Sequence, residues 1–218
     1  MLKALMLKEL RETAWIALVG LLAHLAFVDG FLPFWSTGWT GDFRYQIPFL
    51  GDNFVGAFGY VSVFLAMALG LRQTVWESRG GTWLFLLHRP VSLRRVLAAK
   101  LLVGGGLYLL CGLIAILSYA AWAAMPGRHA SPFRWWMTAS AWEAWGVIGI
   151  VYLGAFLTGI RPARWFGTRL LPLVAGGTLA LLLCIPLAWP PVGITVFLLT
   201  SAGLVGLINF TAQSRDFS

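Results

Sequence analysis

Five long stretches of this chain contain no Asp, Glu, Lys or Arg. A helix that crosses a bilayer needs roughly 20 predominantly apolar residues, and only 11% of the 218 residues are charged, whereas soluble domains carry about 25%. The last stretch is long enough for two such helices, with a turn at Trp189, Pro190 and Pro191. The sequence therefore predicts an all-α integral membrane protein with about six transmembrane helices. The uncharged stretches run Thr13 to Val28, Asn53 to Leu71, Leu101 to Gly127, Ala144 to Ile160 and Leu170 to Ser214.

We expect the whole chain, residues 1–218, to form one transmembrane domain. An amphipathic helix over residues 1–12 precedes the first span, because its apolar side chains gather near one helical face. A cytoplasmic segment at 77–97 separates the second span from the third. The expected spans are 13–32, 53–71, 98–122, 141–160, 170–188 and 192–211.

The basic residues predict the orientation of the chain. With the amino terminus inside, all of the 16 Lys and Arg residues except Arg44, Arg128 and Arg134 fall in cytoplasmic segments. Cytoplasmic loops retain Lys and Arg during insertion. We therefore expect a multi-pass protein of the cell (inner) membrane with both termini cytoplasmic. The position of the basic residues in cytoplasmic segments, next to membrane lipid, then explains the net charge of +8. No nucleic-acid partner is expected.

The sequence lacks the motifs of an enzyme. A phosphate-binding Gly-x-x-x-x-Gly-Lys-Ser/Thr loop is absent, because none of Lys3, Lys8 and Lys100 follows a glycine, and no His-Glu-x-x-His motif is present. Cys111 and Cys184 match no metal-ligand spacing. We expect no catalytic residue, metal or cofactor in this chain.

His24 is a weak candidate for substrate binding. It lies near the middle of the first expected span, where an ionisable group is costly and is taken as functional by default. A neutral imidazole bonded to a neighbouring helix is the alternative. No other residue indicates a cargo.

The segment from residue 77 to residue 100 carries the most information. Gly80 and Gly81 end the preceding helix, Thr82 can cap a new one, and Pro90 stops it after about two turns. Residues 83–87, Trp-Leu-Phe-Leu-Leu, are too few to span a membrane and too apolar for a solvated loop.

Two interpretations of this short apolar helix remain open. A helix lying on the bilayer explains its apolarity. Docking into a groove of a soluble partner also explains the flanking charges of Glu77 and Arg94, with Phe85 and Leu86 as the apolar tip.

In the order of its residues this segment resembles the coupling-helix region of the ABC-2 family of transporter permeases. Residues 1–12 resemble the elbow helix of that family, and Trp189-Pro190-Pro191 resembles its outer re-entrant pair. His88 and Arg89 depart from the usual pattern. The residues that match are Glu77, Gly81, Thr82, Leu86, Leu87, Pro90, Arg94 and Lys100.

The resemblance implies a permease subunit that couples ATP hydrolysis by a separate ATPase to transport, with export as the expected direction. It implies docking of cytoplasmic ABC ATPase subunits, which bind ATP and Mg, and pairing with a second permease subunit, identical or paralogous. Two alternatives stand beside it. One is a haem-exporter-type permease of cytochrome c maturation, and the other is a self-powered secondary carrier, for which the sequence shows neither clear buried charges nor repeats.

Overall fold

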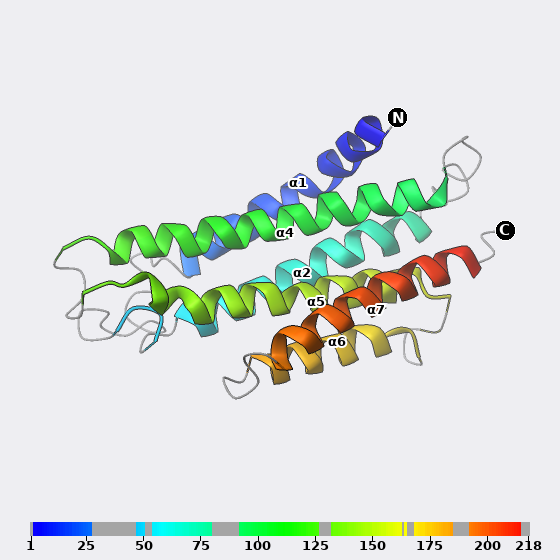
Figure 1. The fold of residues 1–218 in the computed structure, drawn as a ribbon. Helices are drawn as coiled ribbons and strands as arrows, with labels where there is room; N and C mark the ends of the chain where they lie inside the picture. The colour runs from blue at the N-terminus through cyan, green and yellow to red at the C-terminus, as the bar shows by residue number, and fades with distance from the viewer. Residues whose placement is uncertain are drawn as a thin grey trace.

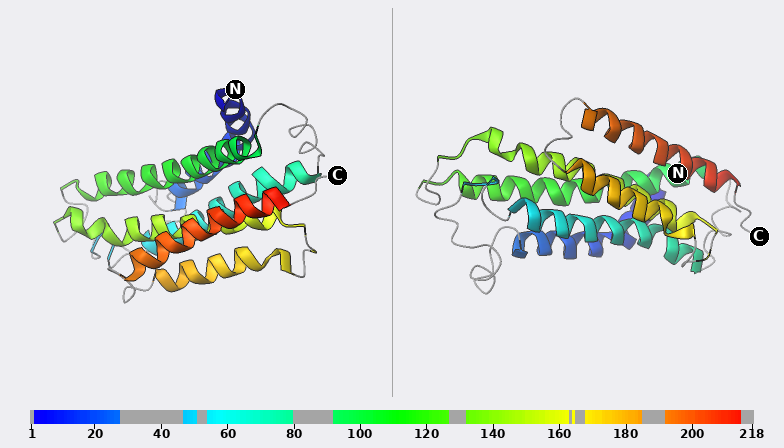
Figure 2. Two further views of the ribbon diagram at one scale, coloured as in Figure 1. Left: turned by 45° about the vertical axis from the view of Figure 1, so that its right-hand side comes forward. Right: turned by 90° about the horizontal axis from the view of Figure 1, so that it is seen from below.

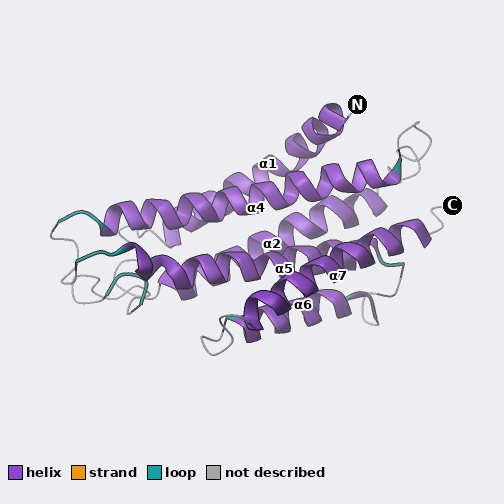
Figure 3. Cartoon of the chain, in the orientation of Figure 1, coloured by secondary structure: helices purple, strands orange, loops and turns teal. Residues whose placement is uncertain are grey.

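The computed structural model describes residues 2–27, 47–50, 54–79, 92–126, 132–162, 164, 168–184 and 192–214. Within these residues the fold is entirely helical, without strands (Figures 1 and 3). The prediction of an all-α protein is confirmed for this part of the chain. The helices are α1 (Leu2–Phe27), α2 (Phe54–Arg79), α4 (Leu93–Ala123), the 3-10 helix η2 (Trp135–Thr138), α5 (Ala139–Ile160), α6 (Leu171–Leu183) and α7 (Val192–Ser214).

The six α-helices run alternately up and down the bundle (Figure 1). The starts of α1, α4 and α6 and the ends of α2, α5 and α7 therefore lie together, at what we call the amino-terminal end of the bundle. The helix ends that flank residues 80–91 and residues 161–170 are both at this end.

Four segments are long and apolar enough to cross a membrane: Phe54–Glu77, Leu93–Ala123, Trp135–Ile160 and Val192–Ser214. The amino-terminal half of α1 carries several charged residues, and α6 has 13 residues, which makes it only about 20 Å long. The structure thus supports a membrane protein with four candidate spans among the described residues.

The helix bounds differ from the expected ones where charged residues lie at helix ends. Residues 2–27 form one helix rather than a separate segment before a span, because no glycine or proline interrupts residues 1–19. Helix α2 continues past Leu71 to Arg79, and α4 begins at Leu93. Arg72 and Glu77 in the extension of α2, and Lys100 near the start of α4, bind partners inside the fold.

Helix α5 lies at the centre of the bundle and packs against α2, α4, α6 and α7. In an apolar 18-residue stretch of Trp135–Ile160, 72% of the residues are buried, whereas in the corresponding stretch of α7 only 11% are buried. Close packing against α2 depends on Gly70, since a Cβ atom there would lie 2.8 Å from the carbonyl oxygen of Tyr152. Helices α1 and α7 lie on opposite sides of the bundle (Figure 2).

An aromatic cluster fills the bundle near the end opposite the amino-terminal one. The ring of Phe49 lies 4.8 Å from that of Phe54 and 4.9 Å from that of Tyr119, and Phe54 stacks on Tyr119 at 4.2 Å. Phe49 adopts a positive φ of 65°, which an L-residue rarely accepts. The burial of its ring, which is 2% exposed, offsets this strain.

Candidate functional site

Lys100 of α4 is completely buried near the amino-terminal end of the bundle. Its Nζ lies 2.8 Å from Oε1 of Glu9 on α1 and 2.8 Å from Oε2 of Glu77 on α2. It also donates a hydrogen bond to the backbone oxygen of Gln73, at 3.2 Å. A buried ammonium group is costly unless it is paired and hydrogen-bonded, and these three contacts supply both requirements.

Lys8 of α1 extends this cluster toward the surface. Its Nζ donates to Oε1 of Glu77 at 2.7 Å and lies 3.6 Å from Glu9 and 3.5 Å from Glu12. Burial alone would lower the pKa of Lys8, but the hydrogen bond and charge of Glu77, together with the charges of Glu9 and Glu12, outweigh burial and raise it. Lys8 therefore remains protonated at physiological pH.

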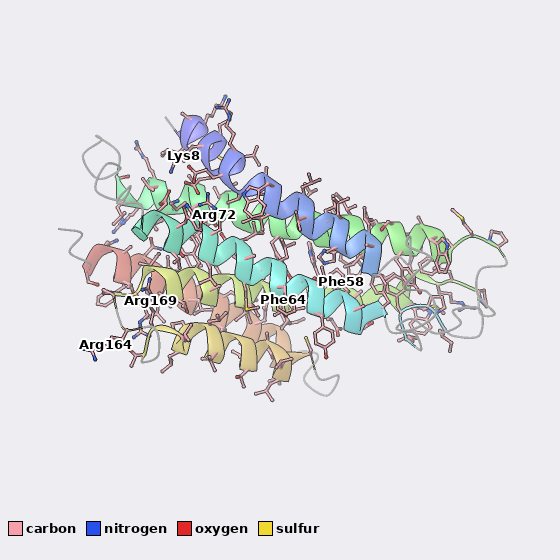
Figure 4. All side chains as sticks on the ribbon, turned by 180° about the vertical axis from the view of Figure 1, so that it is seen from behind. Lys8, Phe58, Phe64, Arg72, Arg164 and Arg169 are labelled. Atoms are coloured by element: carbon pink, nitrogen blue, oxygen red, sulfur yellow. The ribbon has the colours of Figure 1, made fainter. Side chains whose placement is uncertain are left out.

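The cluster is balanced in charge and graded in exposure. Arg72 lies 3.9 Å from Glu12 at the outer edge, and the side chain of Lys8 is 36% exposed while that of Lys100 is 1% exposed. Lys8 and Arg72 are side by side at this end of the bundle in Figure 4. We call the following six residues the ion-pair network: Lys8, Glu9, Glu12, Arg72, Glu77 and Lys100.

Polar side chains hold the network to the centre of the bundle. The side chain of Gln73 donates from Nε2 to the backbone oxygen of Lys100 at 2.9 Å. The Tyr152 hydroxyl of α5 lies 2.9 Å from Oε1 of Gln73 and 3.3 Å from the same oxygen of Lys100. Gly104 leaves the space for these groups, since its Cβ would collide with the side chains of Gln73 and Tyr152. Four helices, α1, α2, α4 and α5, thus meet at one polar centre.

The structure places only part of the expected coupling site. Glu77 belongs to the ion-pair network, with its carboxylate inside the fold. Arg94 is exposed on the first turn of α4. Gly81, Thr82, Phe85, Leu86, Leu87 and Pro90 lie outside the described residues.

His24 is fully buried between α1 and α2. Its Nδ1 lies 2.8 Å from the carbonyl oxygen of Gly20 and its Nε2 lies 3.0 Å from the hydroxyl of Ser62. Because a carbonyl oxygen only accepts, Nδ1 carries the proton and Nε2 accepts from Ser62. Both ring nitrogens are therefore used within the fold, and the ring packs 5.3 Å from Phe58.

Sequence reasoning did not identify Glu9 and Lys100 as an interacting pair. Glu9 lies in the helix expected over residues 1–12, and Lys100 lies at the start of the span expected over 98–122, where it is counted with the cytoplasmic basic residues. One signal was available: Glu9, Glu12 and Glu77 are acidic residues within segments otherwise rich in Lys and Arg. Acidic residues in such segments indicate local pairing.

No family model, curated protein or solved structure matches the chain. Within the described ranges, no three His, Cys, Asp or Glu side chains are grouped as a metal site requires. Cys111 and Cys184 are free thiols. The ion-pair network links α1, α2 and α4 near the amino-terminal end of the bundle.

Proposed function

We propose that this chain is the membrane-spanning permease subunit of an ABC-2 type ATP-binding cassette transporter whose ATPase is a separate polypeptide. In this proposal the protein lies in the cell (inner) membrane, with both termini cytoplasmic and cargo moving outward. In this proposal each of the six α-helices belongs to one of the six expected spans, and α1 combines an elbow with the first span. A second permease subunit, identical or paralogous, completes the pathway.

The observation that carries the proposal is the buried ion pair between Glu77 and Lys100. These residues are the first and the last of the segment whose sequence resembles a coupling-helix region, and their charged groups are 2.8 Å apart. Glu9 of α1 also binds Lys100. A movement of residues 80–91 by a docked ATPase would therefore be transmitted to α1, α2 and α4 together.

Exposed aromatic residues support the membrane orientation. Trp135 and Trp136 are exposed at one end of the bundle, and Trp76 is exposed near the other, where Arg72 lies 5.1 Å from its ring. Tryptophan favours the membrane–water interface. Exposed tryptophans at both ends support a bundle that crosses the membrane, and the Lys and Arg residues of the amino-terminal end favour a cytoplasmic position for that end.

Co-purification tests the proposal. The tagged chain, expressed in its own host and extracted in mild detergent, should retain an ABC ATPase. Leu86→Asp together with Phe85→Asp should remove the ATPase without loss of membrane insertion, because the exchange puts charge into an apolar groove. The matched control is Met125→Asp, an exposed apolar site at the opposite end of α4. Retention of the ATPase by the double variant would contradict the docking role.

A self-powered carrier is the second candidate, and one observation favours it. Carriers use buried ionisable groups for coupling ions, and Glu9, Glu77 and Lys100 are such groups. Uptake or efflux in proteoliposomes that contain this chain alone, driven by a proton gradient and without ATPase, would support the carrier. Transport that requires both ATP and a co-purified ATPase would support the permease.

A further inference from the structure

A shallow hollow lies on the first turns of α1. Its lining residues form two neighbouring rows along the helix, each with members four positions apart. Ala4 is the smallest of them, and its short side chain leaves the hollow between the rows. The rows are Lys3, Leu7 and Arg11, and Ala4, Lys8 and Glu12.

The hollow carries uncompensated positive charge. Lys3 and Arg11 are exposed, and neither forms an ion pair with another residue in the part of the chain that the structure describes. The one carboxylate of the lining, Glu12, lies 3.5 Å from Lys8 and 3.9 Å from Arg72. Its charge is therefore offset, and the two free cations remain to attract an anion.

Apolar surface accompanies the cations of the hollow. Leu7 lines it and is 52% exposed, although water disfavours such exposure. One turn beyond Arg11 along α1, Trp15 is 58% exposed, which is typical of a side chain at the membrane interface. The hollow is thus at the level of lipid headgroups, with apolar surface beside it for acyl chains.

We infer that this hollow binds the phosphate headgroup of an anionic phospholipid, with Lys3 and Arg11 contacting the phosphate and Leu7 contacting the glycerol and upper acyl carbons. Cationic side chains next to apolar surface fit an amphipathic anion. A small free anion would contact only the two cations and would leave the apolar surface unused. The inference rests on the membrane orientation of the proposed function and not on the ATPase. Lys8 lines the hollow and also binds Glu77, so the hollow and the ion-pair network share one residue.

Native mass spectrometry tests the site on the purified full-length chain. The probe is phosphatidylglycerol in competition with phosphatidylcholine. Lys3→Gln combined with Arg11→Gln should weaken phosphatidylglycerol retention by about 25-fold, since each cation near the surface contributes about a fivefold factor. Arg164→Gln is the matched control, because Arg164 is exposed at the same end of the bundle but far from α1 (Figure 4).

Two outcomes would overturn the inference. Equal loss of phosphatidylglycerol from the double variant and from the control would show a diffuse charge effect without a site. Displacement of the lipid by millimolar inorganic phosphate would show an ion site that does not require the acyl chains. Both readouts use the chain without an ATPase, so they are independent of the outcome of the co-purification experiment.

Discussion

Glu77 and Lys100 approach to 2.8 Å inside the bundle, although the chain between them contains the whole of the apolar segment expected to dock an ATPase. The ends of that segment are therefore joined by charge as well as by covalent chain. Because Glu9 shares Lys100 with Glu77, the first helix is joined to the same point. Removal of any of these charges should affect both the fold and the coupling.

Lys100→Met should destabilise the protein by about 3–5 kcal/mol, because it leaves Glu9 and Glu77 as buried carboxylates without their common cation. Thermal unfolding of the detergent-purified chain, followed by loss of the monodisperse peak, measures the effect. Arg95→Met is the control, since Arg95 is exposed on the same helix and should change stability by less than about 0.5 kcal/mol.

The triple variant Glu9→Gln, Glu77→Gln, Lys100→Met should recover part of that loss. Replacing all members of a buried charged group with hydrophobic side chains of similar volume is often neutral or stabilising, whereas removing one member is destabilising; Gln likewise leaves no unpaired charge at nearly the same volume. A triple variant less stable than Lys100→Met alone would show that the charges are not the reason for the loss.

Glu77→Gln and Arg94→Gln should separate folding from coupling. Glu77 is 4% exposed and binds two lysines, so Glu77→Gln should cost about 3 kcal/mol of stability and also weaken transport-linked ATPase activity. Arg94 is exposed, and Arg94→Gln should leave the unfolding temperature unchanged while lowering stimulated ATPase activity. Equal unfolding temperatures for both variants would contradict the structural role of Glu77.

Gly104→Ala should destabilise the bundle by about 1–3 kcal/mol through overpacking, because the added methyl group collides with Gln73 and Tyr152. Gly106→Ala is a matched control two residues away, where an added Cβ meets nothing within 4 Å. It should be neutral or should stabilise the helix by up to about 1 kcal/mol. Similar unfolding temperatures for the two variants would indicate that the polar centre is loosely packed.

Labelling at the two ends of α4 tests the topology. In a background with Cys111→Ala and Cys184→Ala, Ser92→Cys and Met125→Cys introduce thiols at exposed positions. A membrane-impermeant reagent added to intact cells should label the position-125 thiol only, because residue 92 is expected in the cytoplasm. Labelling of the position-92 thiol alone would reverse the orientation.

The sequence predicted the helical class well because lipid imposes a simple requirement. A chain without water around it must satisfy its backbone hydrogen bonds within each segment, so long uncharged stretches become helices. Helix α5 was expected at 141–160 and occupies Ala139–Ile160. Its end coincides with the charged residue Arg161, whereas Glu143 lies inside the helix.

The ion-pair network could not be predicted in the same way. Charged residues mark where an uncharged stretch ends, but they do not show whether a helix also ends there. Helix α2 continues through Arg72 to Arg79 because partners on α1 and α4 neutralise its charged side chains. That compensation depends on which helices are neighbours, and composition along one segment contains no such information. The contact of four helices at the polar centre, where Tyr152 bonds to Gln73, could not be predicted for the same reason.

Gln73 and Lys100 exchange two hydrogen bonds in opposite directions, from the Gln73 amide to the Lys100 carbonyl and from the Lys100 ammonium to the Gln73 carbonyl. Both bonds join α2 to α4 at the same level of the bundle. A shear of α4 along α2 would break both bonds, so the pair resists sliding of one helix along the other. We therefore expect α2 and α4 to move together when force is applied at the amino-terminal end of the bundle.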